Sequence, residues 1–440
     1  MSAILLRCWI SLMTFALLPF AASAQIPMPA QKQQQSILIL NATAHLGNGE
    51  VIKRAAIGFR EGKIDMVLAA IDIRMDSTKY DTIIYAEGQQ LYPGFIAPNS
   101  RLGLVEIDAV RASRDYDDVG LFNPHVRALT AYNTESRITP TVRTNGVLMA
   151  QVAPKGGRIS GTSSIFSLEG WNWEDAVIRQ DDGIHMNWPN YRKQLVKGQA
   201  SDKGKNSTKD NYKKNTQEII DFFLQAQAYT KDEFPLEKNL RFEAMKPLFT
   251  RKAKLFVHAQ RVQELTDAIY FADQFNLEIV VVGAYEAPLV ADLLKDRNIP
   301  VLLRRVHSLP RYEDDNIDLP FRLAFILHKK GLLVGLENSG SMEAMGSRNL
   351  PFYAGTVAAY GLDQETALSM ICLNTAKILG IDHLVGSIEE GKLATFFISE
   401  GDALDMRTNK VVLAFVEGKQ IKLDNPQKLL YRKYSNKYKQ

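Results

Sequence analysis

The fold of this chain is decided by four short apolar runs: AKLFVHA (253–259), LEIVVVGA (277–284), IPVLLRRV (299–306) and KGLLVGLEN (330–338). Each has the length of a buried strand, and an earlier run, GVLMAQVAP (146–154), has the same character. The segments between them, such as VQELTDAIYFADQF (262–275), carry apolar residues at three- and four-residue intervals, which indicates helices with one buried face. Buried strands that alternate with helices predict βα units and a parallel sheet.

Strand-and-turn patterns lie on both sides of this central region. SILILNATAHLGNGEVI (36–52) places Gly47-Asn48-Gly49 between two β-rich runs, and AAIGFREGKIDMVLAA (55–70) repeats the form. Near the end of the chain, VGSIEEGKLATFFISEGD (385–402) and KVVLAFVEGKQIKL (410–423) return to the same pattern. We therefore expect the two β-rich ends to form one sheet domain beside a central barrel.

The first 24 residues have the layout of a secretory signal peptide. Arg7 precedes an apolar run that is shorter than the roughly 20 residues a membrane-spanning helix needs, and Ala22-Ser23-Ala24 suits signal peptidase. This layout predicts export, with a mature start near Gln25 and a periplasmic location in a Gram-negative source. No later stretch has the length and apolarity of a membrane span.

Cysteine usage and charge exclude some other classes. Cys8 leaves with the signal peptide, so Cys372 cannot form an internal disulfide, and its apolar surroundings predict a small buried side chain rather than a nucleophile. A formal charge of +4 over 440 residues gives no reason to expect a nucleic-acid partner. The Lys/Asn-rich stretch 196–215 is predicted to be a solvated loop.

Three segments carry a resemblance to a known family. These are Tyr92-Pro93-Gly94-Phe95-Ile96, Leu373-Asn374-Thr375-Ala376-Lys377-Ile378-Leu379-Gly380 and Gly386-Ser387-Ile388-Glu389-Glu390-Gly391-Lys392. In their order and position they resemble the amidohydrolase superfamily, particularly its imidazolonepropionase-like branch. The resemblance implies an α/β fold: a (β/α)8 barrel over residues 93–384, with a β-sandwich assembled from residues 36–92 and 385–425.

The resemblance also implies a site for zinc or another divalent metal at the carboxyl ends of the barrel strands. Where the family has His-x-His after Pro-Gly-Phe-Ile, this sequence has Asn99 and Arg101. His258 in LFVHA keeps the ligand position after strand five, whereas Val282 stands at the histidine position after strand six. Amide, guanidinium and isopropyl groups are poor or impossible metal ligands, so most of the implied metal site is replaced.

The turn after strand eight is altered as well. By the resemblance, Asn338 occupies the position of the catalytic aspartate, and an amide cannot act as a general base. Loss of a metal would leave an aspartate there uncompensated, a cost that an amide avoids. We expect the Arg101 guanidinium to lie near the vacated cation site and to pair with Glu337, so that no metal cofactor is needed.

Other polar residues are weaker candidates for ligand contact. The glycine-rich segment 155–161 is predicted to follow barrel strand two, where Lys155 and Arg158 would grip a carboxylate. His307 follows strand seven and is predicted to face the barrel mouth or to cap a loop. His185 lies near Trp171 and Trp173, which would form a lid, although packing is the simpler interpretation. His45, His125, His328 and His383 match no ligand position and are predicted to be surface or loop residues.

Two functions remain open on this sequence. The first is an exported hydrolase of carbon–nitrogen bonds, such as those of a cyclic amide or a dipeptide, working with His258 and an altered metal site. The second is a pseudoenzyme that binds a small amide or peptide, forms a homo-oligomer, or pairs with an intact amidohydrolase. The replaced ligands favour the pseudoenzyme, and metal content separates the two.

Overall fold

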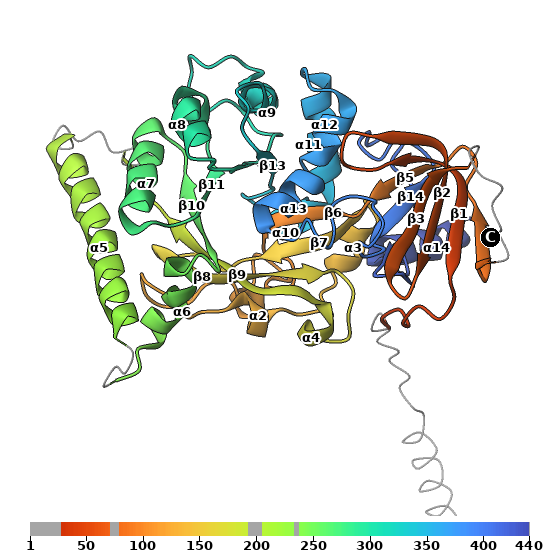
Figure 1. Cartoon of the computed structure of the whole chain (residues 1–440), viewed down its shortest axis with the longest axis horizontal. Helices are drawn as coiled ribbons and strands as arrows, with labels where there is room; N and C mark the ends of the chain where they lie inside the picture. The colour runs from red at the N-terminus through yellow and green to blue at the C-terminus, as the bar shows by residue number, and fades with distance from the viewer. Residues whose placement is uncertain (1–27, 71–78, 192–204, 233–236, 440) are drawn as a thin grey trace, which may run out of the picture.

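The computed structural model describes residues 28–70, 79–191, 205–232 and 237–439. The proposed signal peptide therefore lies outside the described residues. Two sheets of eight strands each organise the chain, one in the centre of the molecule and one at its side (Figure 1). They share no strand, and helices cover the outer surface of the central sheet.

The central sheet has the barrel architecture that the sequence predicts, and it is nearly closed. Seven of its strands run parallel, but β8 is antiparallel to both β7 and β9. Because β8 runs antiparallel, short connections are enough to join β7 to β8 and β8 to β9. The long crossover helices that parallel strands require are therefore not needed at these two positions. In sheet order the strands are β13 (Val334–Leu336), β12 (Val301–Leu303), β11 (Ile279–Gly283), β10 (Lys254–Ala259), β9 (Val177–Asn187), β8 (Ile159–Ser167), β7 (Val147–Val152) and β6 (Phe95–Ser100).

A short connecting segment spans the two edges of this sheet. The backbone N–H of Leu336 in β13 donates to Met370 O, and that of Ile96 in β6 donates to Ile371 O. The interior is filled by apolar side chains at alternate positions of the strands, because successive residues of a strand face opposite sides. These side chains are Ile96, Met149, Ile165, Phe256, Val280, Val282 and Leu302.

The second sheet joins the two ends of the chain, as the sequence predicts. Strand β14 pairs antiparallel with β5, so that Phe396 lies opposite Pro93. Its core is separate from that of the barrel and contains the edge-to-face pair Phe59 and Phe396. The strands are β1 (Ile37–His45), β2 (Val51–Arg60), β3 (Lys63–Ala69), β4 (Thr82–Tyr85), β5 (Gln90–Pro93), β14 (Phe396–Ser399), β15 (Val411–Val416) and β16 (Lys419–Gln420).

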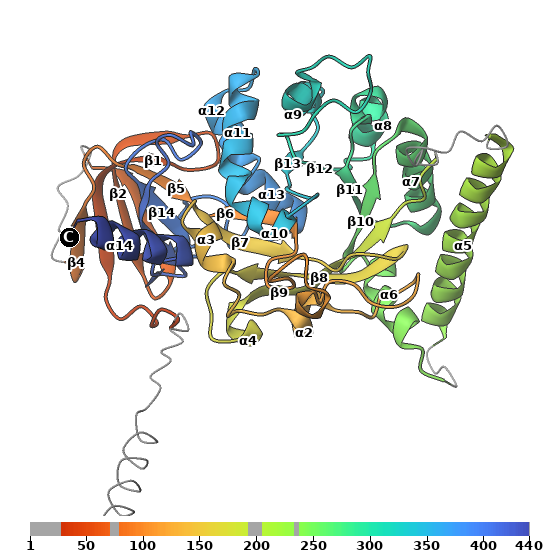
Figure 2. The ribbon, with the colours of Figure 1, turned by 180° about the vertical axis from the view of Figure 1, so that it is seen from behind.

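Helices surround the barrel and one lies on the flanking sheet domain, as Figures 1 and 2 show from opposite sides. None of the described helices has the length and apolarity needed to cross a membrane. The helices are α2 (Ala128–Ala131), α3 (Thr139–Arg143), α4 (Trp173–Ala176), α5 (Lys205–Lys231), α6 (Leu240–Phe249), α7 (Val262–Phe275), α8 (Ala291–Asp296), α9 (Leu319–Lys329), α10 (Glu343–Gly346), α11 (Leu350–Ala359), α12 (Gln364–Ser369), α13 (Leu373–Leu379) and α14 (Pro426–Tyr438).

Helix α5 corrects the prediction of a solvated loop over 196–215. Residues from Lys205 onward are helical, while 192–204 lie outside the described residues. Tyr212, Ile219, Phe223 and Ala226 are buried at helical spacing, and Phe223 packs edge-to-face against Phe271 of α7. The loop prediction was wrong because the apolar stripe begins only at Tyr212, after about two polar turns, and continues beyond the stretch considered.

The predictions for Cys372 and His45 concern side chains that lie away from the barrel mouth. Cys372 is fully buried, and burial raises its pKa to about 12, as expected for a structural cysteine. His45 is also buried, which corrects the prediction of a surface position. It stacks on Tyr92 and contacts Glu365 through Nδ1 (2.6 Å), and because of that carboxylate its pKa is raised despite burial.

Candidate functional site

Two connected cavities lie at the carboxyl ends of the barrel strands. The inner one has a volume of about 200 Å³ and reaches His258 and Val282. The outer one has a volume of about 490 Å³ and lies beside the loop after β12. Both are lined by Gln260, Gly283, Arg304, Ser339 and Gly340, so together they form one mouth.

The inner cavity includes the strand ends that the sequence singled out. His258 lies two residues after the inward-facing Phe256, and Val282 two residues after Val280, so both point into the barrel. His258 and Val282 are also register partners of the β10–β11 pair. The structure therefore brings the one imidazole of the implied ligand set next to an isopropyl group.

Asn99 anchors the first strand end through its backbone and side chain. Its φ of 49° is left-handed, a conformation that asparagine tolerates better than most residues. The backbone N–H donates to Gln151 Oε1 (3.1 Å), and Nδ2 donates to Glu337 Oε2 (3.2 Å). At this position the side chain acts as a hydrogen-bond donor toward a carboxylate.

Arg101 is buried in the inner cavity, but its partner differs from the one expected. Its Nε lies 3.2 Å from Glu343 Oε1, and Lys155 Nζ lies 3.3 Å from the same oxygen. Nη1 donates to the Asn99 backbone oxygen (3.3 Å). The predicted pair with Glu337 was wrong, because Glu343 on α10 reaches the guanidinium first. That short helix carries no motif by which the sequence reveals it.

Glu337 is instead held by neutral donors. Its Oε2 accepts from the Ser339 backbone N–H (2.6 Å) and from Asn99, while Oε1 accepts from Ser339 Oγ (2.6 Å). The side chain is fully buried, and burial raises its pKa to about 7 despite these hydrogen bonds. Glu337 therefore takes up a proton near neutral pH.

Asn338 is turned away from both cavities. Its Nδ2 donates to the Glu343 backbone oxygen (2.9 Å), and its Oδ1 accepts from the Tyr353 hydroxyl. Both ends of the amide are thus used to hold the loop after β13 against α10 and α11. The side chain at the aspartate position has a structural role and lines neither cavity.

His258 contacts a second histidine, His185, whose simpler interpretation, packing, is confirmed, because the ring is fully buried and stacks on Phe256. His185 Nδ1 lies 3.1 Å from His258 Nε2; His185 is fully buried, and His258 is half-buried and lines the inner cavity. Burial, and then the charges of Arg101 and Lys155, lower the pKa of His258 to about 3, and the pKa of His185 is also lowered by burial. Both rings are therefore neutral at pH 7.

The lid interpretation of His185 was wrong. Trp173 begins α4, which precedes the amino end of β9, whereas His185 lies near the carboxyl end of that strand. Because β9 has eleven residues, α4 lies at the end of the barrel opposite the mouth, which the carboxyl end of β9 helps to line. The alternation of His185 and Asn187, both facing the interior side of β9, was the signal that could have placed His185 correctly.

The charged side chains that line the outer cavity are all positive. They are Arg304, Arg305 and Arg311; His307 contributes an imidazole, and among the described residues no Asp or Glu lines the cavity. Arg305 Nη2 donates to the Ser341 backbone oxygen (2.9 Å). His307 faces the mouth, as one of its two interpretations held; its Nε2 lies 2.7 Å from Thr356 Oγ1, and burial lowers its pKa.

Arg158 does not join this group. Its Nη2 lies 2.7 Å from Asn215 Oδ1 and 3.1 Å from Glu218 Oε2, both on α5. Of the two residues predicted to grip a carboxylate together, Lys155 lines the inner cavity, where it contacts Glu343, whereas Arg158 packs against α5. The sequence could not show this because α5 was not expected.

The side chains at the mouth do not fit a divalent metal. The implied ligand positions present an amide, a guanidinium, an isopropyl group and a single imidazole. Arg101 and Lys155 already place positive charge close enough to lower the pKa of His258. Over residues 28–70, 79–191, 205–232 and 237–439, no three His, Cys, Asp or Glu side chains gather as a metal-binding group.

Comparison with known proteins agrees with this architecture. Residues 334–421 match the model of the Amidohydrolase family. An amidohydrolase from Thermotoga maritima MSB8 superimposes with a TM-score of 0.75 at 23% identity, over 88% of this chain and 99% of that one. The chain has the amidohydrolase fold. A search of curated proteins gave no match.

More distant amidohydrolase-fold structures cover similar lengths. A Xaa-Pro dipeptidase with bound methionine in the active site has a TM-score of 0.51 at 13% identity, over 88% of this chain and 100% of that one. Molinate hydrolase has a TM-score of 0.50 at 13% identity, over 90% and 96%. These likenesses confirm the predicted amidohydrolase resemblance at the level of fold, and the function has to be argued from the site.

Proposed function

We propose that this amidohydrolase-fold protein binds a small amide- or peptide-like molecule that carries an anionic group, without hydrolysing it. The observation that carries the proposal is the charge of the mouth. The outer cavity presents Arg304, Arg305 and Arg311, with no acidic side chain among its described lining residues. Carboxylates and phosphates are the groups that arginine binds best, often through two parallel hydrogen bonds.

The inner cavity suits the uncharged part of such a ligand. Asn99, Asn187 and Gln260 line it, and their amides can donate to a carbonyl and accept from an N–H group. Its positive charges, Arg101 and Lys155, both contact the single carboxylate of Glu343, whereas no acidic side chain lines the outer cavity among the described residues. An anion is therefore best held in the outer cavity, with a neutral polar group extending inward toward His258.

We propose that the protein does not hydrolyse its ligand because the mouth lacks a group that can activate water. Hydrolysis on this fold needs a group that activates water, and Asn338 at the aspartate position cannot accept a proton and lines neither cavity. His258 is neutral and close to two cations, which weakens it as a base. Loss of the metal ligands and of the base supports ligand binding as the remaining role.

Calorimetry with matched probes tests this proposal. N-acetylglycine and N-acetylglycinamide differ in the carboxylate, and we expect only the former to bind measurably. Replacing Arg305 and Arg311 by Gln is expected to weaken binding by about tenfold per charge-assisted contact. Arg322→Gln on α9, whose guanidinium pairs with Asp318, is the control and should leave binding unchanged.

Two outcomes contradict the proposal. Equal affinity for the neutral amide would show that the arginines do not select an anion. Release of free amine from either probe, abolished by a chelator and restored by zinc or manganese, would show that the protein is a hydrolase. Metal analysis of protein expressed with both metals completes the comparison.

We also propose export, on the signal-peptide pattern of residues 1–24 alone. The expected product begins near Gln25 and is found in the periplasmic fraction of a Gram-negative host. Mass spectrometry of the amino terminus, after cell fractionation, checks both points. An intact Met1 in the soluble cytoplasmic fraction would contradict them.

A further inference from the structure

The last helix of the chain, α14, exposes an unusual combination of side chains. Its 13 residues include none that is buried. Leu430, Tyr431, Tyr434 and Tyr438 are 53%, 75%, 50% and 81% exposed. An isolated helix of this length is marginal in water, and large apolar side chains gain free energy when they are covered. The exposed side of α14 therefore needs a partner.

Hydrogen bonds connect the first turn of α14 to the rest of the protein. Asn425 caps the helix through Oδ1, which accepts from the Lys428 backbone N–H (2.7 Å), and its Nδ2 donates to Thr144 Oγ1 (3.3 Å). Thr141 Oγ1 on α3 donates to Gln427 Oε1 (2.9 Å). The first turn is thus anchored, and the remaining turns project their side chains outward.

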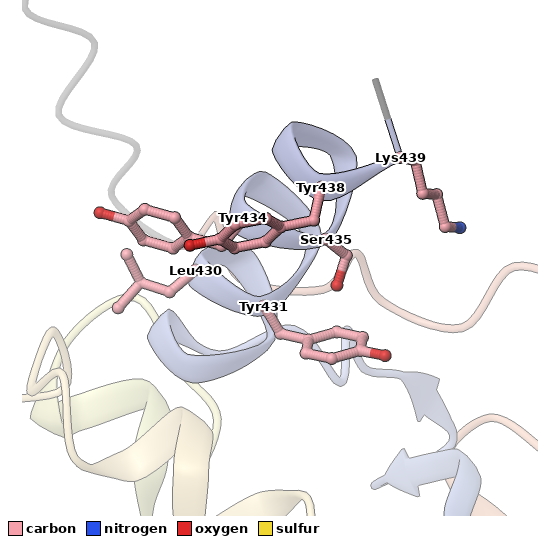
Figure 3. Close-up of a pocket in the computed structure, with 6 residues that line it drawn as sticks. All are labelled: Leu430, Tyr431, Tyr434, Ser435, Tyr438 and Lys439. Atoms are coloured by element: carbon pink, nitrogen blue, oxygen red, sulfur yellow. The ribbon is translucent and has the colours of Figure 1, made fainter.

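The apolar side chains gather on one side of the helix. Leu430, Tyr434 and Tyr438 recur every four residues, so they lie above one another, and Figure 3 shows them pointing to the same side. Tyr431 points to the neighbouring side, with Ser435 and Lys439 along the same row. Together with Leu430, Tyr434 and Tyr438 they line a shallow groove.

Two lysine side chains lie close to the tyrosine rings of α14. Lys433 Nζ lies 5.7 Å from the centre of the Tyr434 ring, and Lys437 Nζ lies 5.7 Å from that of Tyr438. Residues 426–439 contain five Lys and Arg residues and no Asp or Glu. The helix therefore presents amphipathic rings and positive charges on one surface, repeated with the period of the helix.

We propose that α14 is a docking surface for an anionic phospholipid membrane. Tyrosine rings suit the boundary between headgroups and acyl chains, where the ring is covered and the hydroxyl stays in water. Lysines beside them attract anionic headgroups, and basic amphipathic helices lie in the plane of such interfaces. Of the five cations, Arg432 pairs with Asp424, and a purely apolar groove on a partner protein would leave the four lysines without counter-charges, which makes a charged surface the better complement.

Vesicle flotation of the full chain tests this assignment. We expect the protein to float with vesicles of phosphatidylglycerol and phosphatidylcholine, and not with pure phosphatidylcholine. Lys433→Gln with Lys437→Gln should weaken binding roughly fivefold for each lysine removed. The matched control is Lys329→Gln with Lys330→Gln on α9, which removes the same charge from another exposed site and should bind as the wild type does.

The aromatic contribution is tested separately. Tyr434→Ser with Tyr438→Ser should reduce flotation, while Tyr85→Ser with Tyr270→Ser, which alters two rings exposed elsewhere, should not. Circular dichroism and thermal unfolding establish that all variants remain folded. Equal flotation of the lysine variant and its control would overturn the proposal. So would a dimer in light scattering that the Tyr434/Tyr438 variant abolishes, without any vesicle binding, since it assigns the surface to a second copy.

Discussion

Replacing Glu337 by Gln is expected to stabilise the protein at alkaline pH. Burial raises the pKa of this carboxyl from 4.5 to about 7, and each pKa unit is worth about 1.4 kcal/mol. Keeping Glu337 ionised in the folded protein therefore costs about 3 kcal/mol. Because its pKa is raised by folding, the carboxyl takes up a proton when the chain folds, and the stability this confers is lost as the pH rises toward 7 and beyond.

The Gln side chain fits the same hydrogen bonds. Its oxygen can accept from the Ser339 backbone N–H and from Asn99 Nδ2, as Glu337 Oε2 does, while its amide nitrogen can donate to Ser339 Oγ. The Ser339 hydroxyl, which lines both cavities, then turns its own hydrogen toward the cavity, so the variant differs mainly in lacking an ionisable group. The effect should therefore depend on pH.

Urea unfolding at pH 5 and pH 8 measures this effect. The free energy of unfolding of Glu337→Gln, relative to the wild type, should increase by about 2.5 kcal/mol between the two pH values. Glu135→Gln, at an exposed position, is the control and should show no such increase. If the free energy of unfolding of Glu337→Gln differs from that of the wild type by the same amount at both pH values, within about 0.5 kcal/mol, the reasoning is refuted.

Three further predictions rest on other buried groups. His258→Gln should reduce the loss of stability between pH 7 and pH 4. The pKa of His258 is lowered in the folded protein, so the imidazole of the unfolded chain binds a proton more readily in this pH range. An unchanged pH profile of the free energy of unfolding in urea would contradict this prediction. Phe223→Ala should lower the free energy of unfolding by about 3–5 kcal/mol, and Leu224→Ala, at a 46% exposed position, by much less; equal losses would show that α5 does not pack on α7. Cys372 should resist a thiol reagent at pH 8 until the protein is unfolded, and rapid labelling of the native state would disprove its burial.

Much of the fold could be predicted because its signals are local. The apolar runs that became β7, β10, β11, β12 and β13, and the turn-rich ends that joined into one sheet, are visible as periodic patterns in the sequence. Strand β8 was not predicted, because ISGTSSIFS (159–167) lacks the apolar character of the other runs, and its antiparallel direction could not be predicted either. The helix α5 was missed because its apolar stripe begins only after about two polar turns.

The candidate site was predictable only at its strand ends. The family resemblance placed His258 and Val282 at the ends of two barrel strands, and they lie at the ends of β10 and β11, where both line the inner cavity. The partners were not, because Glu343, His185 and the arginines after β12 come from segments separated by long stretches of chain. A pairing between side chains so far apart in sequence depends on where the backbone returns, which no local pattern encodes.

The sequence by itself determined the chemical types available at the barrel mouth, and hence that amide, guanidinium and isopropyl groups stand where metal ligands are implied. Only the tertiary structure decided how these groups are used: Arg101 pairs with Glu343, Asn338 braces a loop, and three arginines surround the outer cavity. The physical reason is that each residue's chemical type can be read directly from the sequence. Charge pairing, burial and the resulting pKa values depend instead on distances between side chains, which are defined only in the folded chain.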